Sequence, residues 1–343
     1  MLLHQVEANL HILGKVIRDG AFVPSYPRRW RPTVRAFVLP AFDQAPEIRE
    51  LPVPETGEGE VRVRVHAASV NGFDLAVANG YLNGAMEHRF PVVLGRDFAG
   101  VVDAVGHGVD GYAVGDRVFG VITGSHLGDG TFAEYLTVPT TVGLARIPES
   151  VSFEDAAALG LAGAAAVDSV DAAAIEPGMV VLVAGATGGV GTLAVQLATI
   201  AGAQVIATAH TDQERAHVTG IGATGTVDFT GDIPEQVHAV HPDGVDVVLH
   251  FAGDPAPLAA AVKPGGAFVS TIAQSAEQAG SPHAAFTSVF ATPTTDTLQR
   301  LADHHAQQRI HVTIQHNYRL EDLAEAFAHF TAGTLGKLII TID

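Results

Sequence analysis

The spacing of hydrophobic and polar positions changes most clearly within residues 180–201, VVLVAGATGGVGTLAVQLATIA. A short β-branched run opens this stretch, a glycine-rich loop follows, and apolar residues then recur at helical spacing. This pattern predicts a buried strand, a tight turn and a helix, in that order. Glycine allows a loop backbone to approach a pyrophosphate closely, and the first amides of the following helix have no partner. The stretch therefore predicts a dinucleotide-binding unit, although its glycines are spaced G-x-x-G-G-x-G.

Upstream of this unit the pattern is typical of β-structure. Residues 60–67, EVRVRVHA, alternate strictly between apolar and polar side chains. Further short apolar runs bounded by glycine turns lie at residues 34–39, 92–105, 115–118 and 131–138. Such a series of short strands predicts a small barrel or sandwich.

From residue 153 onward, predicted helices and strands alternate. An alanine-rich helix is expected at 153–170, and helices are expected at 211–219, 255–262 and 295–307. After the strand at 180–183, strands are expected at 204–209, 245–250, 267–271 and 285–291. This alternation predicts a doubly wound parallel sheet, so the fold class is α/β. The chain then ends in an expected strand at 312–314, a helix at 320–332 and a strand at 337–342.

The first 32 residues differ from the rest. A leucine-rich helical stripe predicts a short amphipathic helix, and a basic, proline-broken connector follows it. Two interpretations stay open: a docking helix for a partner or a second subunit, or an extension without such a role.

Composition narrows the classes of function. A length of 343 residues predicts about two domains, and the net charge of −18 disfavours nucleic-acid binding and association with anionic membranes. The absence of cysteine excludes disulfides, thiolate zinc sites and a cysteine nucleophile. His4 and Glu7 interrupt any signal-peptide core, and Asp168 and Asp171 interrupt the longest apolar region. A cytoplasmic protein is therefore expected.

Eight short segments follow one another along the chain: SVNGFD (69–74), PVVLGRDFAGVV (91–102), GDRVFG (115–120), FAEY (132–135), AGATGGVG (184–191), IGATGTVDF (221–229), PGGAFVS (264–270) and GKLII (336–340). In this order they resemble the medium-chain dehydrogenase/reductase superfamily, specifically its zinc-independent quinone oxidoreductase (zeta-crystallin-like) branch. The resemblance implies a chaperonin-10-like β-barrel catalytic domain at 33–155, a Rossmann cofactor domain at 156–309, and a return to the catalytic domain at 310–343. Residues 1–32 would be an N-terminal extension, and the active site would lie in the cleft between the domains.

Metal ligands are missing where this superfamily's zinc enzymes carry them. The segment that holds a cysteine in those enzymes reads Asn71-Gly72-Phe73-Asp74, and the histidine position is Arg96. A guanidinium group has no free lone pair and cannot ligate a metal. Histidine pairs such as His304-His305 fall on predicted exposed helices, so no metal site is expected.

The cofactor predicted from these residues is NADPH. The second strand of the Rossmann unit ends without the acid that binds the ribose of NAD, and Arg215 follows as a candidate for the 2′-phosphate. Asp212 weakens this assignment, and a solvated helix arginine is the alternative. The residues expected to bind the cofactor, most of them by resemblance, are Thr187, Gly188, Gly189, Val190, Gly191, Thr211, Arg215, Asp254, Val289, Phe290 and Lys337.

Two side chains are candidates for the reacting centre. Asn71 matches the family's asparagine near the nicotinamide, and Tyr81 is the nearest candidate donor to a substrate carbonyl. The alternatives are a buried asparagine that satisfies loop backbone and an aromatic packed at the pocket mouth. Ala165 and Ala76 stand where family members often carry threonine and tyrosine, so both positions lack a hydroxyl.

The leading hypothesis is a metal-free oxidoreductase that transfers hydride from NADPH to a quinone or an α,β-unsaturated carbonyl compound. One alternative is an enoyl-thioester reductase, and another is a non-catalytic NADPH-binding sensor or partner module acting through residues 1–32. A homodimer is expected, because the strand at 285–291 would lie at the sheet edge and need cover.

Overall fold

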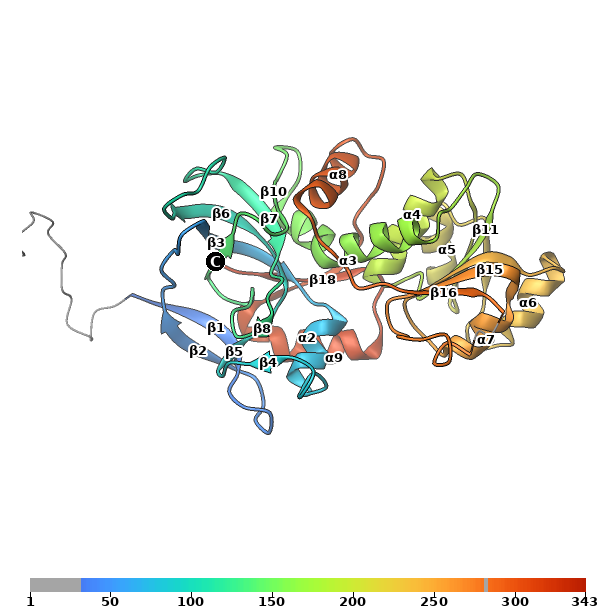
Figure 1. Cartoon of the computed structure of the whole chain (residues 1–343), viewed down its shortest axis with the longest axis horizontal. Helices are drawn as coiled ribbons and strands as arrows, with labels where there is room; N and C mark the ends of the chain where they lie inside the picture. Colours follow the sequence, from blue (N-terminus) through green and yellow to red (C-terminus); the bar gives the residue numbers. More distant parts are fainter. Residues whose placement is uncertain (1–31, 281–282) are drawn as a thin grey trace, which may run out of the picture.

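The computed structural model describes residues 32–280 and 283–343. The amphipathic helix expected at the start of the chain lies outside the described residues. Figure 1 shows a β-rich lobe, blue to green, beside an α/β lobe, yellow to orange, with α3 (Phe153–Ala172) between them. Within the described part of the chain, no helix has the length and apolar character needed to cross a membrane.

The β-rich lobe is built from short, mostly antiparallel strands, as the alternating pattern predicts. They are β1 (Thr33–Leu39), β2 (Glu47–Pro52), β3 (Glu60–Ser69), β4 (Glu87–His88), β5 (Val92–Val93), β6 (Asp97–Val105), β7 (Arg117–Val121), β8 (His126–Leu127), β9 (Tyr135–Pro139) and β10 (Leu144–Arg146). Val61, Val63 and Val65 of β3 are fully buried, so one face of the strand forms the core. The short helix α2 (Gly72–Ala78) follows β3 and was not predicted.

The end of the chain returns to this lobe. It forms β17 (Ile314–Arg319), the 3₁₀ turn η3 (Leu320–Asp322), α9 (Leu323–Ala332) and β18 (Lys337–Thr341). The sheet order is β10-β7-β6-β3-β18-β17, with β9 also paired to β3. The strand expected at 312–314 is β17, which begins at Ile314 and ends at Arg319. Residues 315–317 of this edge strand are polar and exposed, so the hydrophobic pattern did not indicate a strand there.

The α/β lobe contains a six-stranded parallel sheet, which confirms the predicted fold class. Its order is β13 (Gly225–Val227), β12 (Gln204–Thr208), β11 (Val180–Ala184), β14 (Val245–His250), β15 (Val262–Ser270) and β16 (Ala285–Ser288). The helices that follow α3 along the chain are α4 (Gly189–Ile200), α5 (Asp212–Gly220), α6 (Ile233–Val240), α7 (Pro255–Ala260) and α8 (Thr295–Ala306). β13 and α6 were not predicted. Val262 begins β15 rather than ending a helix, because it pairs with Val245 of β14.

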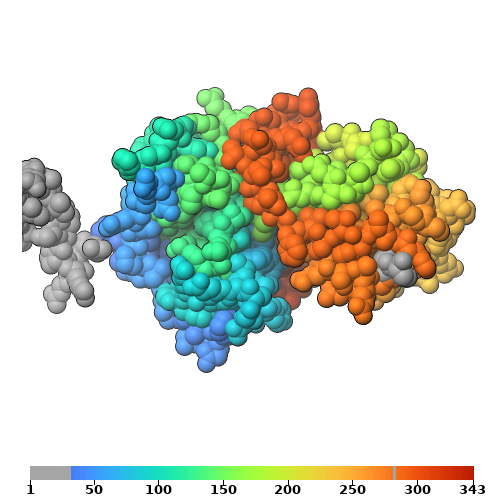
Figure 2. Space-filling model, in the orientation of Figure 1, coloured from blue at the N-terminus to red at the C-terminus, as the bar shows by residue number. Residues whose placement is uncertain are grey.

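One hydrophobic core joins the two lobes. It includes Ala99 and Phe119 of the β-rich lobe, Val181 and Val183 of β11, and many alanines of α3. Helix α3 is therefore buried around most of its circumference, as a helix between two sheets must be. On the face seen in Figure 2, α8 lies in dark orange over the junction of the lobes, where it packs against α3 and β10.

Candidate functional site

A pocket of about 570 Å³ opens at the carboxyl ends of the parallel strands β11, β12 and β14. This edge of a doubly wound sheet is where such folds bind ligands. Its walls come from the glycine loop, the turns after β12, β13 and β14, and residues 332–335 of the returning chain. Three of the predicted cofactor residues line it: Thr187, Thr211 and Asp254.

The glycine loop forms a tight cradle beside this pocket. A Cβ atom built on Gly191 would lie 2.1 Å from the carbonyl oxygen of Gly185, and Gly185 has a φ of +77°. Thr208 accepts a hydrogen bond from the Gly185 amide at 3.0 Å and so fixes the loop to β12. Helix α4 begins at Gly189 with Gly188 as its N-cap, and no side chain caps its first turn. The free amides and close-approach backbone fit the pyrophosphate of a dinucleotide.

The acidic residue Glu214 follows β12, and it was not predicted from the end of that strand. Glu214 lines the pocket together with Thr211. Its carboxylate accepts hydrogen bonds from the amides of His210, at 2.6 Å, and Thr211, at 2.9 Å, while Thr211 Oγ1 accepts one from the Glu214 amide. The spacing Thr-x-x-Glu is a capping box, and this signal is visible in the sequence.

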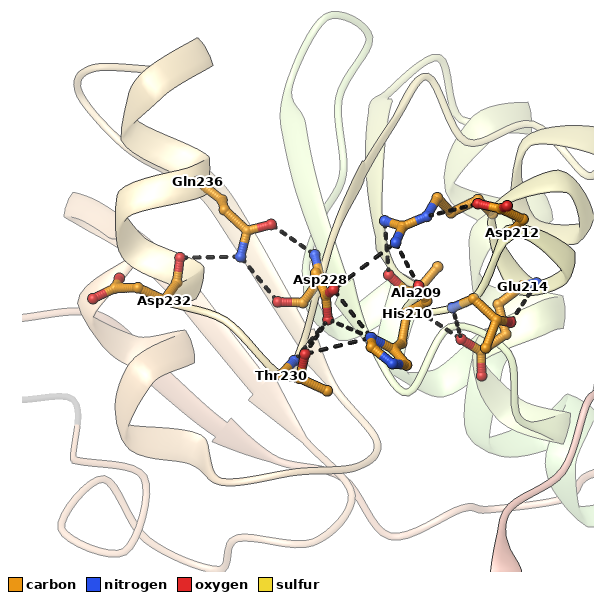
Figure 3. A network of polar contacts seen from close by, with 10 residues as sticks. Ala209, His210, Asp212, Glu214, Asp228, Thr230, Asp232 and Gln236 are labelled. Carbon is orange, nitrogen blue, oxygen red and sulfur yellow. Dashed lines mark hydrogen bonds and ion pairs between the residues drawn. The ribbon is translucent and has the colours of Figure 1, made fainter.

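Arg215 does not line the pocket in this conformation. Its guanidinium group donates to the carbonyl oxygens of Ala209 and His210 and lies 3.8 Å from the carboxylate of Asp228. Figure 3 shows Asp228 at the centre of this network, between His210 and Thr230 on one side and Gln236 on the other. Hydrogen bonds from the amide and hydroxyl of Thr230, and then from His210, lower the pKa of Asp228 to about 2. A 2′-phosphate held by Arg215 would therefore lie near the carboxylate of Asp228 and that of Asp212, which is 3.9 Å from the guanidinium group.

A buried histidine supports the wall of the pocket that the turn after β14 forms. His250 Nε2 lies 3.1 Å from the carbonyl oxygen of Gly253, which only accepts, so this nitrogen carries the proton. His250 Nδ1 lies 3.0 Å from Ser270 Oγ, which in turn accepts from the amides of Ile272 and Ala273. Burial lowers the pKa of His250, which keeps the ring neutral in this arrangement. The histidine thus fixes the turn at Gly253 that forms part of the pocket.

We expect His250→Phe to weaken dinucleotide binding about tenfold, because the turn after β14 loses its hydrogen bond from the ring and about 1–3 kcal/mol of support. Isothermal titration calorimetry with the reduced cofactor measures the effect. His238→Phe is the control, since His238 is exposed on α6 and bonds only the Pro242 carbonyl. Equal affinities in wild type and His250→Phe would remove this support role.

A second polar cluster lies where the returning strand β18 crosses the glycine loop. Gly336 donates from its amide to the Thr187 carbonyl at 2.6 Å, and a Cβ atom on Gly189 would lie 2.3 Å from Lys337 Cδ. The buried Lys337 ammonium donates to the Val70 carbonyl at 2.9 Å and to Asn71 Oδ1 at 2.7 Å. Burial lowers the pKa of Lys337. Lys337 therefore links the glycine loop to Asn71.

Both donor positions of the Asn71 amide are occupied. Asn71 Nδ2 donates to Asp97 Oδ2 at 2.9 Å and to the Ser69 carbonyl at 3.1 Å. Asp97, fully buried, also accepts from the Ser69 amide and hydroxyl at 2.8 Å and faces the Leu161 amide at 3.3 Å. In this arrangement Asn71 organises loop backbone, which is the alternative that its burial suggested, and it has no donor left for a substrate. Asp97 and Ser69 were not predicted as site residues.

The remaining predicted residues lie apart from these two clusters. Tyr81 follows α2 and is 78% exposed, and no described pocket includes it. Val289 is buried just after β16, whereas Phe290 is 72% exposed. The roles assigned to Tyr81, Val289 and Phe290 stay predictions.

Comparisons with known proteins match this geometry. The family model described as "Alcohol dehydrogenase GroES-like domain" matches residues 57–149, and the model described as "Zinc-binding dehydrogenase" matches residues 189–288. A solved quinone oxidoreductase from Coxiella burnetii is 26% identical, with a TM-score of 0.82 over 91% of this chain and 100% of its own. A solved NAD-dependent alcohol dehydrogenase is 29% identical, with a TM-score of 0.80 over 90% and 100%. The chain belongs to the medium-chain dehydrogenase/reductase superfamily.

Curated members of the superfamily are similar over part of their length. A quinone oxidoreductase of Sus scrofa is 34% identical over 59% of each chain. A 2-methylene-furan-3-one reductase of Solanum lycopersicum is 34% identical over 63% of this chain and 56% of its own. A mycocerosic acid synthase-like polyketide synthase of Mycobacterium tuberculosis is 37% identical over 64% of this chain and 10% of its own. The chain spans less than two thirds of the length of these relatives.

The residues that the structure describes offer no set of zinc ligands. Over residues 32–280 and 283–343, no group of three or more histidine, aspartate or glutamate side chains could hold a metal ion. The sequence has no cysteine, and Arg96 stands directly before Asp97.

Proposed function

We propose that this protein is an NADPH-dependent, zinc-independent oxidoreductase that reduces quinones or α,β-unsaturated carbonyl compounds. The observation that carries the proposal is the junction between the uncapped glycine loop and the buried cluster of Lys337, Asn71 and Asp97. It brings a dinucleotide-binding backbone into direct contact with a charged, water-poor centre. The likeness to a quinone oxidoreductase and an enone reductase supports the choice of acceptor.

In this proposal the chain's own groups bind and orient the cofactor and the acceptor. The amides of the first turn of α4 would hold the pyrophosphate, and the turn fixed by His250 would border the adenosine half. Lys337 and Asp97 keep the loop at Asn71 in one conformation. When bound, the reduced cofactor supplies a hydride, so the protein need only position the acceptor and stabilise the negative charge that develops on its oxygen.

Steady-state assays with purified full-length protein test the proposal. We expect oxidation of NADPH that depends on an added quinone or enone and that a chelator does not change. Failure with a broad panel of both acceptor classes would contradict it. Tight NADPH binding without turnover, together with loss of a partner on deletion of residues 1–32, would favour the sensor alternative.

An enoyl-thioester reductase is the second candidate, and the likeness to a polyketide synthase segment supports it. Both candidates use the same cofactor loop and differ only in the acceptor. Crotonyl-type thioesters distinguish them: a higher kcat/KM with the thioester than with any quinone or simple enone would favour the second candidate.

Cofactor preference depends on Arg215, which must exchange its carbonyl contacts for the 2′-phosphate. We expect Arg215→Ala to weaken NADPH binding about ten- to hundredfold, the worth of a charge-assisted hydrogen bond, and to leave NADH binding unchanged. Affinities for both cofactors, measured by fluorescence titration, test this. Arg300→Ala on α8 is the control, because its guanidinium pairs only with Asp171 at 3.4 Å. Equal effects on NADPH and NADH would remove Arg215 from this role.

The same proposal extends to a cytoplasmic homodimer with the domain boundaries expected from the sequence. Strand β16 forms an open edge of the parallel sheet, and Phe290 beside it is exposed. Light scattering coupled to size-exclusion chromatography measures the oligomeric state.

A further inference from the structure

Three buried polar atoms near β6 have no hydrogen-bond partner among the described residues: Asp74 Oδ1, Arg96 Nε and Thr131 Oγ1. They belong to neighbouring groups. A Cβ atom built on Gly95, the residue before Arg96, would lie 2.4 Å from Thr131 Oγ1, and the charges of Asp74 and Arg96 interact. Buried polar groups in folded proteins are normally satisfied by protein, water or a ligand. These three side chains are therefore short of hydrogen-bond partners among the described residues.

Arg96 is the cation of this group, and no ion pair or hydrogen bond joins its guanidinium group to a carboxylate among the described residues. Both oxygens of Asp97 are taken by Ser69 and Asn71, and Asp74 Oδ2 accepts from the backbone N–H of Asn71 at 2.8 Å. The guanidinium carbon lies 4.5 Å from the centroid of the Phe73 ring, which holds the group in place without satisfying its N–H donors. Burial lowers the pKa of Arg96, but a guanidinium stays protonated in proteins.

This guanidinium belongs to the same cluster as the cofactor loop. Lys337 contacts Gly189 of the loop and bonds Asn71, and Asn71 bonds Asp97, the residue that follows Arg96. Arg96 as a whole is only partly buried, although its Nε atom is buried, so part of the side chain is open to solvent. An acceptor bound beside the loop would thus meet a preorganised cation with free donors.

We propose that Arg96 binds a negatively charged oxygen of the substrate. The acceptor is then a carbonyl compound that also carries an ionised or ionisable hydroxyl group. This inference rests on the proposed reductase function and assigns Arg96 a role at the same site. It deepens that function by naming the substrate group that this chain recognises.

The charge of the cluster should make this binding depend on pH. Asp74 faces Asp97 of β6, Lys337 of β18 and Arg96, and burial followed by the charge of Asp97 raises the pKa of Asp74 to about 8. Below that pH Asp74 is uncharged, so Arg96 and Lys337 outweigh Asp97 and an anion is favoured. Above it Asp74 is ionised, the surplus positive charge is cancelled, and anion binding weakens.

The probe for the test is 2-hydroxy-1,4-naphthoquinone, a coloured quinone whose hydroxyl is ionised at neutral pH. Titration of full-length protein saturated with oxidised cofactor, followed by the probe's absorbance, gives its Kd. We expect Arg96→Gln to raise this Kd about ten- to hundredfold, the worth of a hydrogen bond to a charged group, and Arg96→Lys to raise it less. The matched control is Arg117→Gln, because Arg117 also stacks on a phenylalanine, Phe153, at 4.7 Å but lies outside the cluster.

A second arm measures the same Kd between pH 6.5 and 9.5. The Kd should rise above pH 8 in wild type and change less in Asp74→Asn, which cannot ionise; this arm holds even if Arg96→Gln does not fold. An unchanged Kd in Arg96→Gln, an equal loss in Arg117→Gln, or no binding by wild type would overturn the inference. Wild-type reductase activity with an unchanged Kd in Arg96→Gln would refute only the inference. Arg96-dependent probe binding without any reductase activity would refute only the proposed function.

Discussion

Asp97→Ala is expected to lower the free energy of unfolding by about 3–5 kcal/mol, the cost of breaking a buried, hydrogen-bonded charged group. Asp97 is fully buried and accepts from the Ser69 amide, the Ser69 hydroxyl and the Asn71 side chain. Its removal leaves those donors unsatisfied. Of the two carboxylates whose charges act on the buried Lys337 ammonium, Asp97 and Asp74, only Asp74 then remains. A cavity also opens beneath Gly160 of α3, whose backbone packs closely on Asp97.

Urea denaturation followed by circular dichroism measures this effect. Asp103→Ala is the matched control, since Asp103 lies on the same strand but is partly exposed and pairs only with Arg62. Exposed pairs of this kind contribute about 0–1 kcal/mol. If Asp97→Ala destabilised the protein no more than Asp103→Ala, the buried cluster would not have the structural importance assigned to it.

Gly191→Ala is expected to weaken binding of either reduced nicotinamide cofactor by about a hundredfold or more, because the glycine cradle requires close backbone approach. The added Cβ would lie 2.1 Å from the Gly185 carbonyl oxygen and 2.7 Å from Ala186 Cα, both of them backbone atoms that cannot rotate away. The loop would have to open, which removes the close approach to the pyrophosphate and the alignment of the first amides of α4.

Fluorescence titration with NADPH and NADH tests this prediction, with thermal unfolding as a check on folding. Gly220→Ala is the control, because a Cβ atom at the end of α5 would meet nothing within 4 Å. Wild-type affinity in Gly191→Ala would mean that the dinucleotide does not use this loop.

The fold was largely predictable because its strongest elements carry their own patterns. The buried run at Val180–Ala184, the alternation in Glu60–Ser69 and the alanine-rich Phe153–Ala172 each follow from local spacing. Strand β17 was misplaced because it is an exposed edge strand, and Val262 was taken as helical because strand pairing, which is non-local, decides its conformation.

The site was less predictable because its chemistry comes from contacts distant in sequence. Asn71 and Lys337 were both singled out, but only the fold shows that they bond each other and that Asp97 takes the amide donors of Asn71. Glu214 was overlooked although its capping box is local, because the positions considered for an acid were the strand end and Asp212. Arg96 was considered as a residue that cannot bind zinc and as a possible ion-pair partner of Asp97, since the lack of a partner for its Nε atom is visible only in three dimensions.

The most direct test of the central claim is a single-turnover measurement with reduced cofactor that carries deuterium at one or the other C4 position. Cofactor bound in a fixed orientation should be oxidised by an added quinone or enone, more slowly when one stereoisomer is deuterated and at the normal rate when the other is. Absence of acceptor-dependent oxidation, or equal rates for both deuterated isomers and the unlabelled cofactor, would contradict hydride transfer at this site.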